Sequence, residues 1–170
     1  NVVEQAQGRY EFWEYDALVT AMSQRNIRII FILDYGNPLY DYGFPPNSPE
    51  GRAAFARFAA AAARHYRGKG IVWEVWNEPN TGWIKPGPED SGGERFEKLY
   101  ARALGKPASD RGVVRTFEAY LKLYAATARG VRRADPEARI GGPALASGPF
   151  ENSERGHCMN GRGFALGLIL

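Results

Sequence analysis

Two runs of apolar residues, mostly β-branched or aromatic, limit what this chain can fold into. They span residues 27–33 and 71–76, and each has the length of a single strand. Runs of this length and composition are typical of strands that are buried on both faces, as in parallel sheets. Parallel strands cannot be joined by a tight turn and need a longer crossover, usually a helix. The two runs therefore predict an α/β fold.

Helical patterns separate these runs. Apolar residues recur at helical spacing over 15–22, 55–66 and 117–131, and residues 138–145 give a third strand interrupted by two glycines and a proline. Ser48 and Pro49 predict the start of the middle helix, as its N-cap and first helical residue. The order helix, strand, helix, strand, helix, strand predicts a parallel sheet with right-handed crossovers.

Three strands cannot close a barrel, and a complete (β/α)8 barrel takes about 250 residues. We therefore expect residues 1–146 to form a partial (β/α)8 barrel, and residues 147–170 to form an atypical tail. The polar stretch 81–112 is expected to be a long loop with a short helical insert. An open sheet exposes apolar edges, so a piece of this kind is expected to be marginally stable or self-associating.

Composition excludes some classes of function. A net charge of +3 over 170 residues is too weak to indicate a nucleic acid or an anionic membrane as partner. No run of about 18 apolar residues is present, so no membrane span is expected. The single cysteine, Cys158, permits no intrachain disulfide and leaves the redox compartment open. The chain begins without Met, so we expect it to be processed or excerpted from something longer.

Polar and aromatic residues follow the first two predicted strands. In parallel α/β folds, functional groups gather just past the carboxyl ends of the strands. The residues concerned are Asp34, Tyr35, Asn37 and Tyr40 after the first strand, and Trp76, Asn77, Glu78, Trp83 and Lys85 at or after the end of the second. Carboxylates, amides and flat rings together suit a sugar, because its hydroxyls need donors and acceptors and its apolar face stacks on aromatic rings. These residues are the candidate substrate site.

Asn77-Glu78-Pro79 at the end of a strand resembles the acid/base motif of clan A glycoside hydrolases. The blocks 31–40, 51–55 and 73–80 narrow the resemblance to family 39, including endoglycosidases that cut bacterial exopolysaccharide. The similarity runs from about Gly8 to about Ala146, except for an apparent insertion near 88–112. It implies that this chain supplies strands three to five of the barrel, that the partner is a carbohydrate, and that no metal or cofactor is needed. Localisation stays open, although the family is compatible with secretion or the periplasm.

The resemblance also implies a retaining mechanism, which needs two carboxyl groups about 5–5.5 Å apart. Glu78 matches the general acid/base, a role that requires a raised pKa. Asn77 matches the residue that hydrogen-bonds the sugar 2-hydroxyl. The nucleophile of the clan is a Glu after the seventh strand, which we expect beyond Leu170. This chain alone is therefore expected not to hydrolyse glycosides at a normal rate.

Other interpretations stay open for these residues. Glu78 could be an ordinary loop carboxylate, and the four residues after the first strand could form a loop held by Asx turns and packed tyrosines. Glu74 shares its parity with Trp76 and Glu78, so it is expected to point inward and to support the site rather than to react. His65 is expected at the surface, and His157 with Cys158 lacks the further ligands of a zinc site.

For the whole chain, the alternatives are a carbohydrate-binding pseudoenzyme, an inactive fragment that lacks the nucleophile, and an unrelated α/β hydrolase or isomerase with Glu78 as base. The sugar, the linkage and the oligomeric state are not specified by the sequence.

Overall fold

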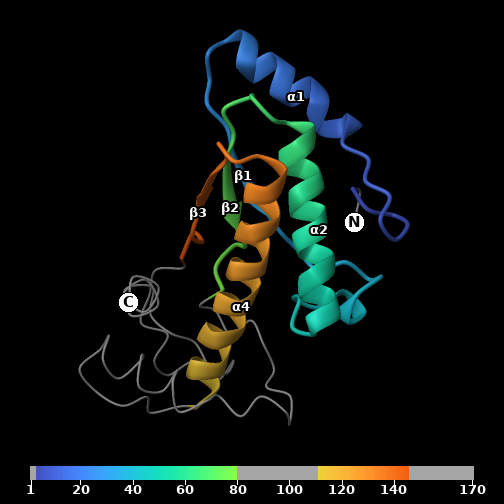
Figure 1. Ribbon diagram of the computed structural model, residues 1–170, viewed down its shortest axis with the longest axis vertical. Helices are drawn as coiled ribbons and strands as arrows, with labels where there is room; N and C mark the ends of the chain where they lie inside the picture. Colours follow the sequence, from blue (N-terminus) through green and yellow to red (C-terminus); the bar gives the residue numbers. More distant parts are fainter. Residues whose placement is uncertain (1–2, 80–110, 146–170) are drawn as a thin grey trace, which may run out of the picture. The chain divides into compact units, whose positions relative to one another are not determined.

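The computed structural model describes residues 3–79 and 111–145 (Figure 1). Its elements are α1 (Trp13–Gln24), β1 (Ile30–Leu33), the 3-10 turn η1 (Asp41–Gly43), α2 (Pro49–His65), β2 (Val72–Val75), α4 (Arg111–Ala134) and β3 (Arg139–Gly141). The predicted order of helices and strands is confirmed, and this part of the chain is α/β. The first 77 residues and Leu123–Pro143 form one compact unit, which contains the sheet. Among the described residues, a second unit contains Glu78, the start of α4 and Ala144.

Part of the sequence-based prediction lies outside the described residues. This part includes Trp83, Lys85, the stretch 88–110 and the tail 147–170. Arg111 and Gly112 were predicted to end a loop, but they belong to the first turn of α4. No helix within the described ranges is long and apolar enough to cross a membrane.

The three strands form one parallel sheet in the order β1-β2-β3. Val72 lies between Ile30 and Arg139 in the register, so the strands begin at one edge of the sheet and end together at the other. Strand β3 is shorter than the predicted run 138–145. Its pairing stops at Gly141 because Gly142 and Pro143 follow, and proline has no N–H to donate to a neighbouring strand.

Helix α2 covers only one face of the sheet. The rings of Phe31 and Trp73 pack against Tyr66, at the end of α2, with centroids 5.9 and 6.4 Å apart. The alternate residues Ile30 and Ile32 are 62% and 43% exposed. In a strand, alternate side chains point to opposite faces, so the second face is left open. The expected exposure of apolar strand side chains is thus found on β1.

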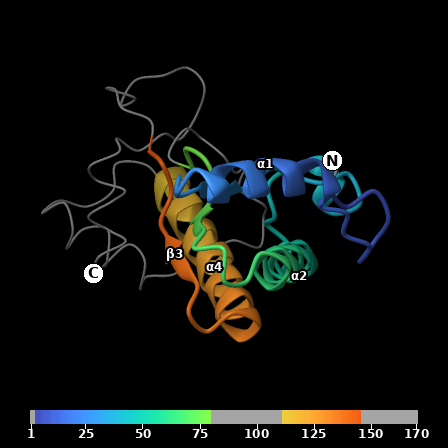
Figure 2. The same ribbon diagram turned by 90° about the horizontal axis from the view of Figure 1, so that it is seen from above.

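Within the first unit, the part of α4 from Leu123 onward lies beside α2 (Figures 1 and 2). The two helices approach closely at Gly130, where a Cβ would lie 2.7 Å from the carbonyl oxygen of Ala56. Glycine permits this contact because it has no side chain. Nearby in α4, Thr127 and Val131 are fully buried, and the Thr127 hydroxyl donates to the Leu123 carbonyl at 2.8 Å. The helix pair is therefore tightly packed without leaving this hydroxyl unsatisfied.

Helix α1 is joined to the end of α2 through one carboxylate. Asp16 accepts a hydrogen bond from the Tyr66 hydroxyl at 3.0 Å and lies 2.7 Å from Nε2 of His65. The hydrogen bond from His65 is the main cause that lowers the pKa of Asp16. His65 is exposed, as expected, and its contact with Asp16 connects the two helices.

The predicted start of α2 is confirmed. Ser48 has extended backbone angles, and its hydroxyl accepts the N–H of Gly51 at 2.8 Å, with Pro49 as the first helical residue. The Asp41 carboxylate adds hydrogen bonds from the N–H groups of Asn47 and Ser48, at 3.0 and 3.3 Å. This carboxylate fixes the loop that connects β1 to α2.

Replacement of Ser48 tests how much its side chain stabilises the start of α2. Ser48→Ala removes the acceptor for the Gly51 N–H and should lower the free energy of unfolding by about 1 kcal/mol. Ser48→Thr keeps the hydroxyl and should lose much less. Urea unfolding followed by circular dichroism measures both. An equal loss in the two variants would show that the hydroxyl is not the cause.

Candidate active site

The carboxyl ends of β1 and β2 meet at one edge of the sheet, as predicted. The Trp76 N–H donates to the Leu33 carbonyl at 3.0 Å, just where both strands end. Asp34 follows immediately after β1, and Glu74 lies in β2 opposite Ile32. Burial raises the pKa of Asp34 to about 6, and the charge of Glu74 adds to the shift. The site therefore contains two interacting carboxyl groups, one of which holds a proton in mildly acidic solution.

This pair should make the stability of the chain depend on pH. The pKa of Asp34 is about 6 in the folded chain, compared with an ordinary value of 3.8. The folded chain therefore binds this proton more tightly than the unfolded chain does. The resulting stabilisation is fully present below about pH 4 and is lost as the pH rises through 6. Because Asp34 is partly exposed, solvent screening reduces the effect to about 1 kcal/mol.

Asp34→Asn should remove this dependence, because the amide does not ionise. The expected result is a smaller fall in the free energy of unfolding between pH 4 and 7 than in the unmodified chain. Glu74→Gln should keep part of the fall, since it removes only the smaller cause of the shift. Urea titrations at each pH give the slopes. The same slope in Asp34→Asn and the unmodified chain would contradict the assignment.

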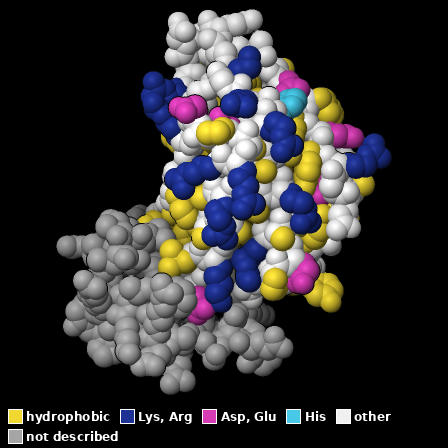
Figure 3. Space-filling view, in the orientation of Figure 1, with side chains coloured by type: hydrophobic (Ala, Val, Ile, Leu, Met, Phe, Trp, Pro, Cys, Tyr) yellow, Lys and Arg dark blue, Asp and Glu magenta, His cyan; other side chains and the backbone are white. Residues whose placement is uncertain are grey.

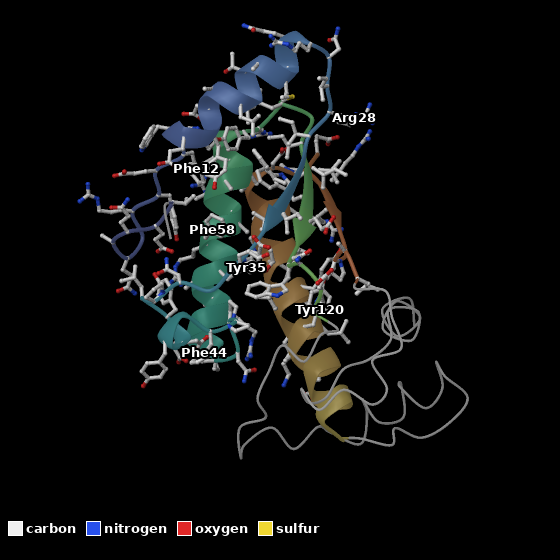
Figure 4. The ribbon with its side chains drawn as sticks, turned by 180° about the vertical axis from the view of Figure 1, so that it is seen from behind. Phe12, Arg28, Tyr35, Phe44, Phe58 and Tyr120 are labelled. Carbon is white, nitrogen blue, oxygen red and sulfur yellow. The ribbon has the colours of Figure 1, made fainter. Side chains whose placement is uncertain are left out.

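Aromatic residues form the next part of this edge. Trp76 is buried and packs against Phe55 of α2, with centroids 5.9 Å apart. Tyr35 meets Trp76 edge-on at 5.9 Å and is itself exposed (Figure 4). The prediction that Trp76 shares a face with Glu74 is wrong, since α2 covers the opposite face. The cause is the left-handed backbone of Trp76, with φ of 64°, which ends the strand alternation.

Asn37 and Tyr40, predicted to contact substrate, both bind the N-terminal segment. The Tyr40 hydroxyl donates to Oε1 of Glu4 at 2.8 Å, and the Asn37 amide donates to the Glu4 carbonyl at 2.9 Å. Glu4 is only 4% exposed, and its Oε1 also accepts the Gly8 N–H at 2.7 Å. Glu4 belongs to no motif that the sequence reveals. A carboxylate directly after the apolar pair Val2-Val3 was the one indication that it could be buried.

A small cavity lies beside these residues. Its volume is about 20 Å³, and its lining comprises Glu4, Tyr35, Asn37, Tyr40, Pro46, Gly51, Phe55 and Phe58. This volume suffices for one water molecule and is too small for a sugar ring. Within the first unit, Asn37 and Tyr40 therefore hold the loop after β1 in place. Tyr35 is an exposed aromatic residue of this loop, as are Tyr42 and Phe44.

Glu78 is held through its backbone. Its N–H donates to the carbonyl of Ala144 at 2.9 Å, which connects it to the chain that follows β3. The Glu78 side chain is exposed, and its φ of 47° lies in the left-handed region. Such backbone costs about 1–3 kcal/mol in a residue other than glycine, and it is concentrated at functional sites. Asn77, half-buried, directly precedes it at the carboxyl end of β2.

Comparisons with known proteins indicate one family. The sequence model of glycosyl hydrolases family 39 matches residues 109–166, which include α4 and β3. The chain resembles glycoside hydrolase family 39. Among solved structures, a family 39 glycoside hydrolase from the gut symbiont Bacteroides cellulosilyticus WH2 is similar, with a TM-score of 0.54 and 22% identity. No curated protein sequence matches the chain.

These similarities cover different parts of the chain. The likeness to the Bacteroides enzyme covers 82% of this chain but only 23% of that enzyme, and at 22% identity it shows the fold. The family 39 match begins after Glu78, so it supports the family without testing the acid/base residue. The roles of Asn77 and Glu78 therefore depend on the motif and on its place at the end of β2.

Proposed function

We propose that this chain is part of a retaining glycosidase that cleaves O-glycosyl bonds of a poly- or oligosaccharide. The observation that carries the proposal is the position of Asn77 and Glu78, directly after a strand of the parallel sheet. The fold of the chain resembles that of a family 39 glycoside hydrolase. Reactive groups of (β/α)8 enzymes lie at this end of their strands. In this proposal β1, β2 and β3 are strands three to five of the barrel, within residues 1–146. The segment near 88–112 is then an insertion, and 147–170 a tail.

Each residue has its own role in this proposed mechanism. Glu78 protonates the leaving oxygen and later acts as base, and Asn77 hydrogen-bonds the 2-hydroxyl of the sugar. Asp34, Tyr35 and the pair Trp83 and Lys85 would contact the substrate. Glu74 would support the site through Asp34. Trp76, Asn37 and Tyr40 would shape the site chiefly through the packing described above.

The test compares two proteins on one polysaccharide. The 170-residue chain should show no turnover, while a longer polypeptide that adds the strand with the nucleophile should hydrolyse the substrate with retention of anomeric configuration. Proton NMR of the first product gives the anomer. Binding without cleavage by the longer polypeptide would favour the pseudoenzyme and overturn the proposal. Turnover by the 170-residue chain that Glu78→Gln abolishes would instead show that the nucleophile lies within this chain.

A further inference from the structure

A second hollow lies at the opposite edge of the sheet, where the strands begin. Its volume is about 380 Å³, within the ordinary range of small-molecule pockets. It is formed by the segments that lead into the three strands and by the first residues of β2 and β3, and its lining includes Arg28, Arg67 and Arg139. Figure 4 shows Arg28 at the start of β1, far along the sheet from Tyr35. This pocket is thus separate from the candidate active site.

Arg28, just before β1, and Arg139, in β3, line the pocket at the two outer strands of the sheet. Ile30, Val72 and Arg139 are aligned across the sheet, and Arg28 precedes Ile30 by two residues. Two strand spacings place the backbones of β1 and β3 roughly 10 Å apart. Gly70, two residues before Val72 in the middle segment, has a φ of 68°, and a Cβ there would meet nothing within 4 Å. The middle segment therefore leaves open space in the pocket at the level of Arg28.

The charges in the pocket are unevenly paired. Arg67 lies 3.7 Å from Asp135, whose carboxylate also accepts the Glu137 N–H at 3.2 Å. Within the described residues, Arg28 and Arg139 form no ion pair. Glu137 also lines the pocket, and its single negative charge repels a bound anion. Two guanidinium groups thus face one exposed carboxylate, which leaves the pocket positive.

The surroundings add to this positive charge. Helices α2 and α4 both end near this edge, and the carbonyl ends of helices repel anions. Their last turns carry Arg64, Arg132 and Arg133, which offset that repulsion. Lys and Arg side chains gather over these two helices in Figure 3. Arginine is suited to carboxylates and phosphates because its planar fork donates two parallel hydrogen bonds.

We propose that this pocket binds a small molecule that bears a carboxylate or phosphate group, held by Arg28 and Arg139. The site is independent of the glycosidase proposal, since it lies at the other end of the strands. Inorganic phosphate and glucuronate serve as probes for the two anion classes, with glucose as the neutral control. The shifts of arginine Nε–Hε resonances in the 170-residue chain report binding directly.

Saturable shifts with phosphate, glucuronate or both, and none with glucose, are the expected result. Arg28→Gln and Arg139→Gln should each weaken binding about tenfold, whereas Glu137→Gln should strengthen it, because it removes an opposing charge. Arg64→Gln, outside the pocket lining, is the matched control and should change the affinity far less. Binding of phosphate alone assigns a phosphate ester, and binding of glucuronate alone assigns a carboxylate. Absence of binding, or equal weakening by Arg64→Gln and Arg28→Gln, would overturn the proposal.

Discussion

In a longer polypeptide that contains this chain and the strand with the proposed nucleophile, Glu78→Gln should lower kcat/KM about 1000-fold on a substrate with a poor leaving group. General acid catalysis contributes roughly 10²- to 10⁴-fold, and the amide cannot donate a proton to the leaving oxygen. The change preserves size and shape, and the backbone hydrogen bond from Glu78 to Ala144 does not involve the side chain. Binding of the oligosaccharide should therefore be retained.

Leaving groups of different acidity separate an acid/base role from general damage. The phenolate of an aryl glycoside with an acidic phenol leaves without protonation. The first chemical step on such a substrate should therefore be slowed far less in Glu78→Gln than the same step on an alkyl glycoside. Glu50→Gln, an exposed carboxylate in the first turn of α2, is the matched control and should leave both substrates unaffected. An equal loss on both substrates would argue that Glu78 does not act as the acid.

The elements of this fold could be predicted because their determinants are local. The helical spacing of apolar residues and the Ser-Pro start of α2 each depend on neighbouring residues, and both predictions are confirmed. The strand ends were harder to predict. The run 71–76 appears as one strand, yet Trp76 has a left-handed backbone and turns its ring toward α2. Alternation in the sequence holds only while the backbone stays extended.

The candidate site was predictable in position but not in its internal contacts. The carboxyl ends of parallel strands must meet at one edge, which places Asp34 and Asn77 there from the sequence alone. The pairing of Asn37 and Tyr40 with Glu4 joins residues 33 and 36 positions apart, and no local pattern encodes it. The raised pKa of Asp34 likewise depends on burial and on a neighbouring strand. Contacts between distant segments set the chemistry of this site.

Glu4→Ala should be the most destabilising single change at this site, with a loss of about 3 kcal/mol in the free energy of unfolding. The carboxylate is buried and accepts hydrogen bonds from Tyr40 and Gly8, and hydrogen bonds to a charged group are worth about 1.5–3 kcal/mol. The variant leaves both donors without that acceptor. Glu4→Gln keeps one side-chain oxygen and should lose less. Glu11→Ala, at an exposed position of the same segment, should change stability little.

A double-mutant cycle decides whether Glu4 acts through Tyr40. Tyr40→Phe removes only the hydroxyl that donates to Glu4 and should cost about 1 kcal/mol. If the two side chains hold the loop together, Glu4→Ala and Tyr40→Phe in one chain should cost less than their sum by at least about 0.5 kcal/mol. Strict additivity would show that the hydrogen bond between Tyr40 and Glu4 does not contribute to the free energy of unfolding. Because this loop carries Tyr35, a coupled result would also show that the N-terminal segment positions the exposed aromatic residue of the candidate active site.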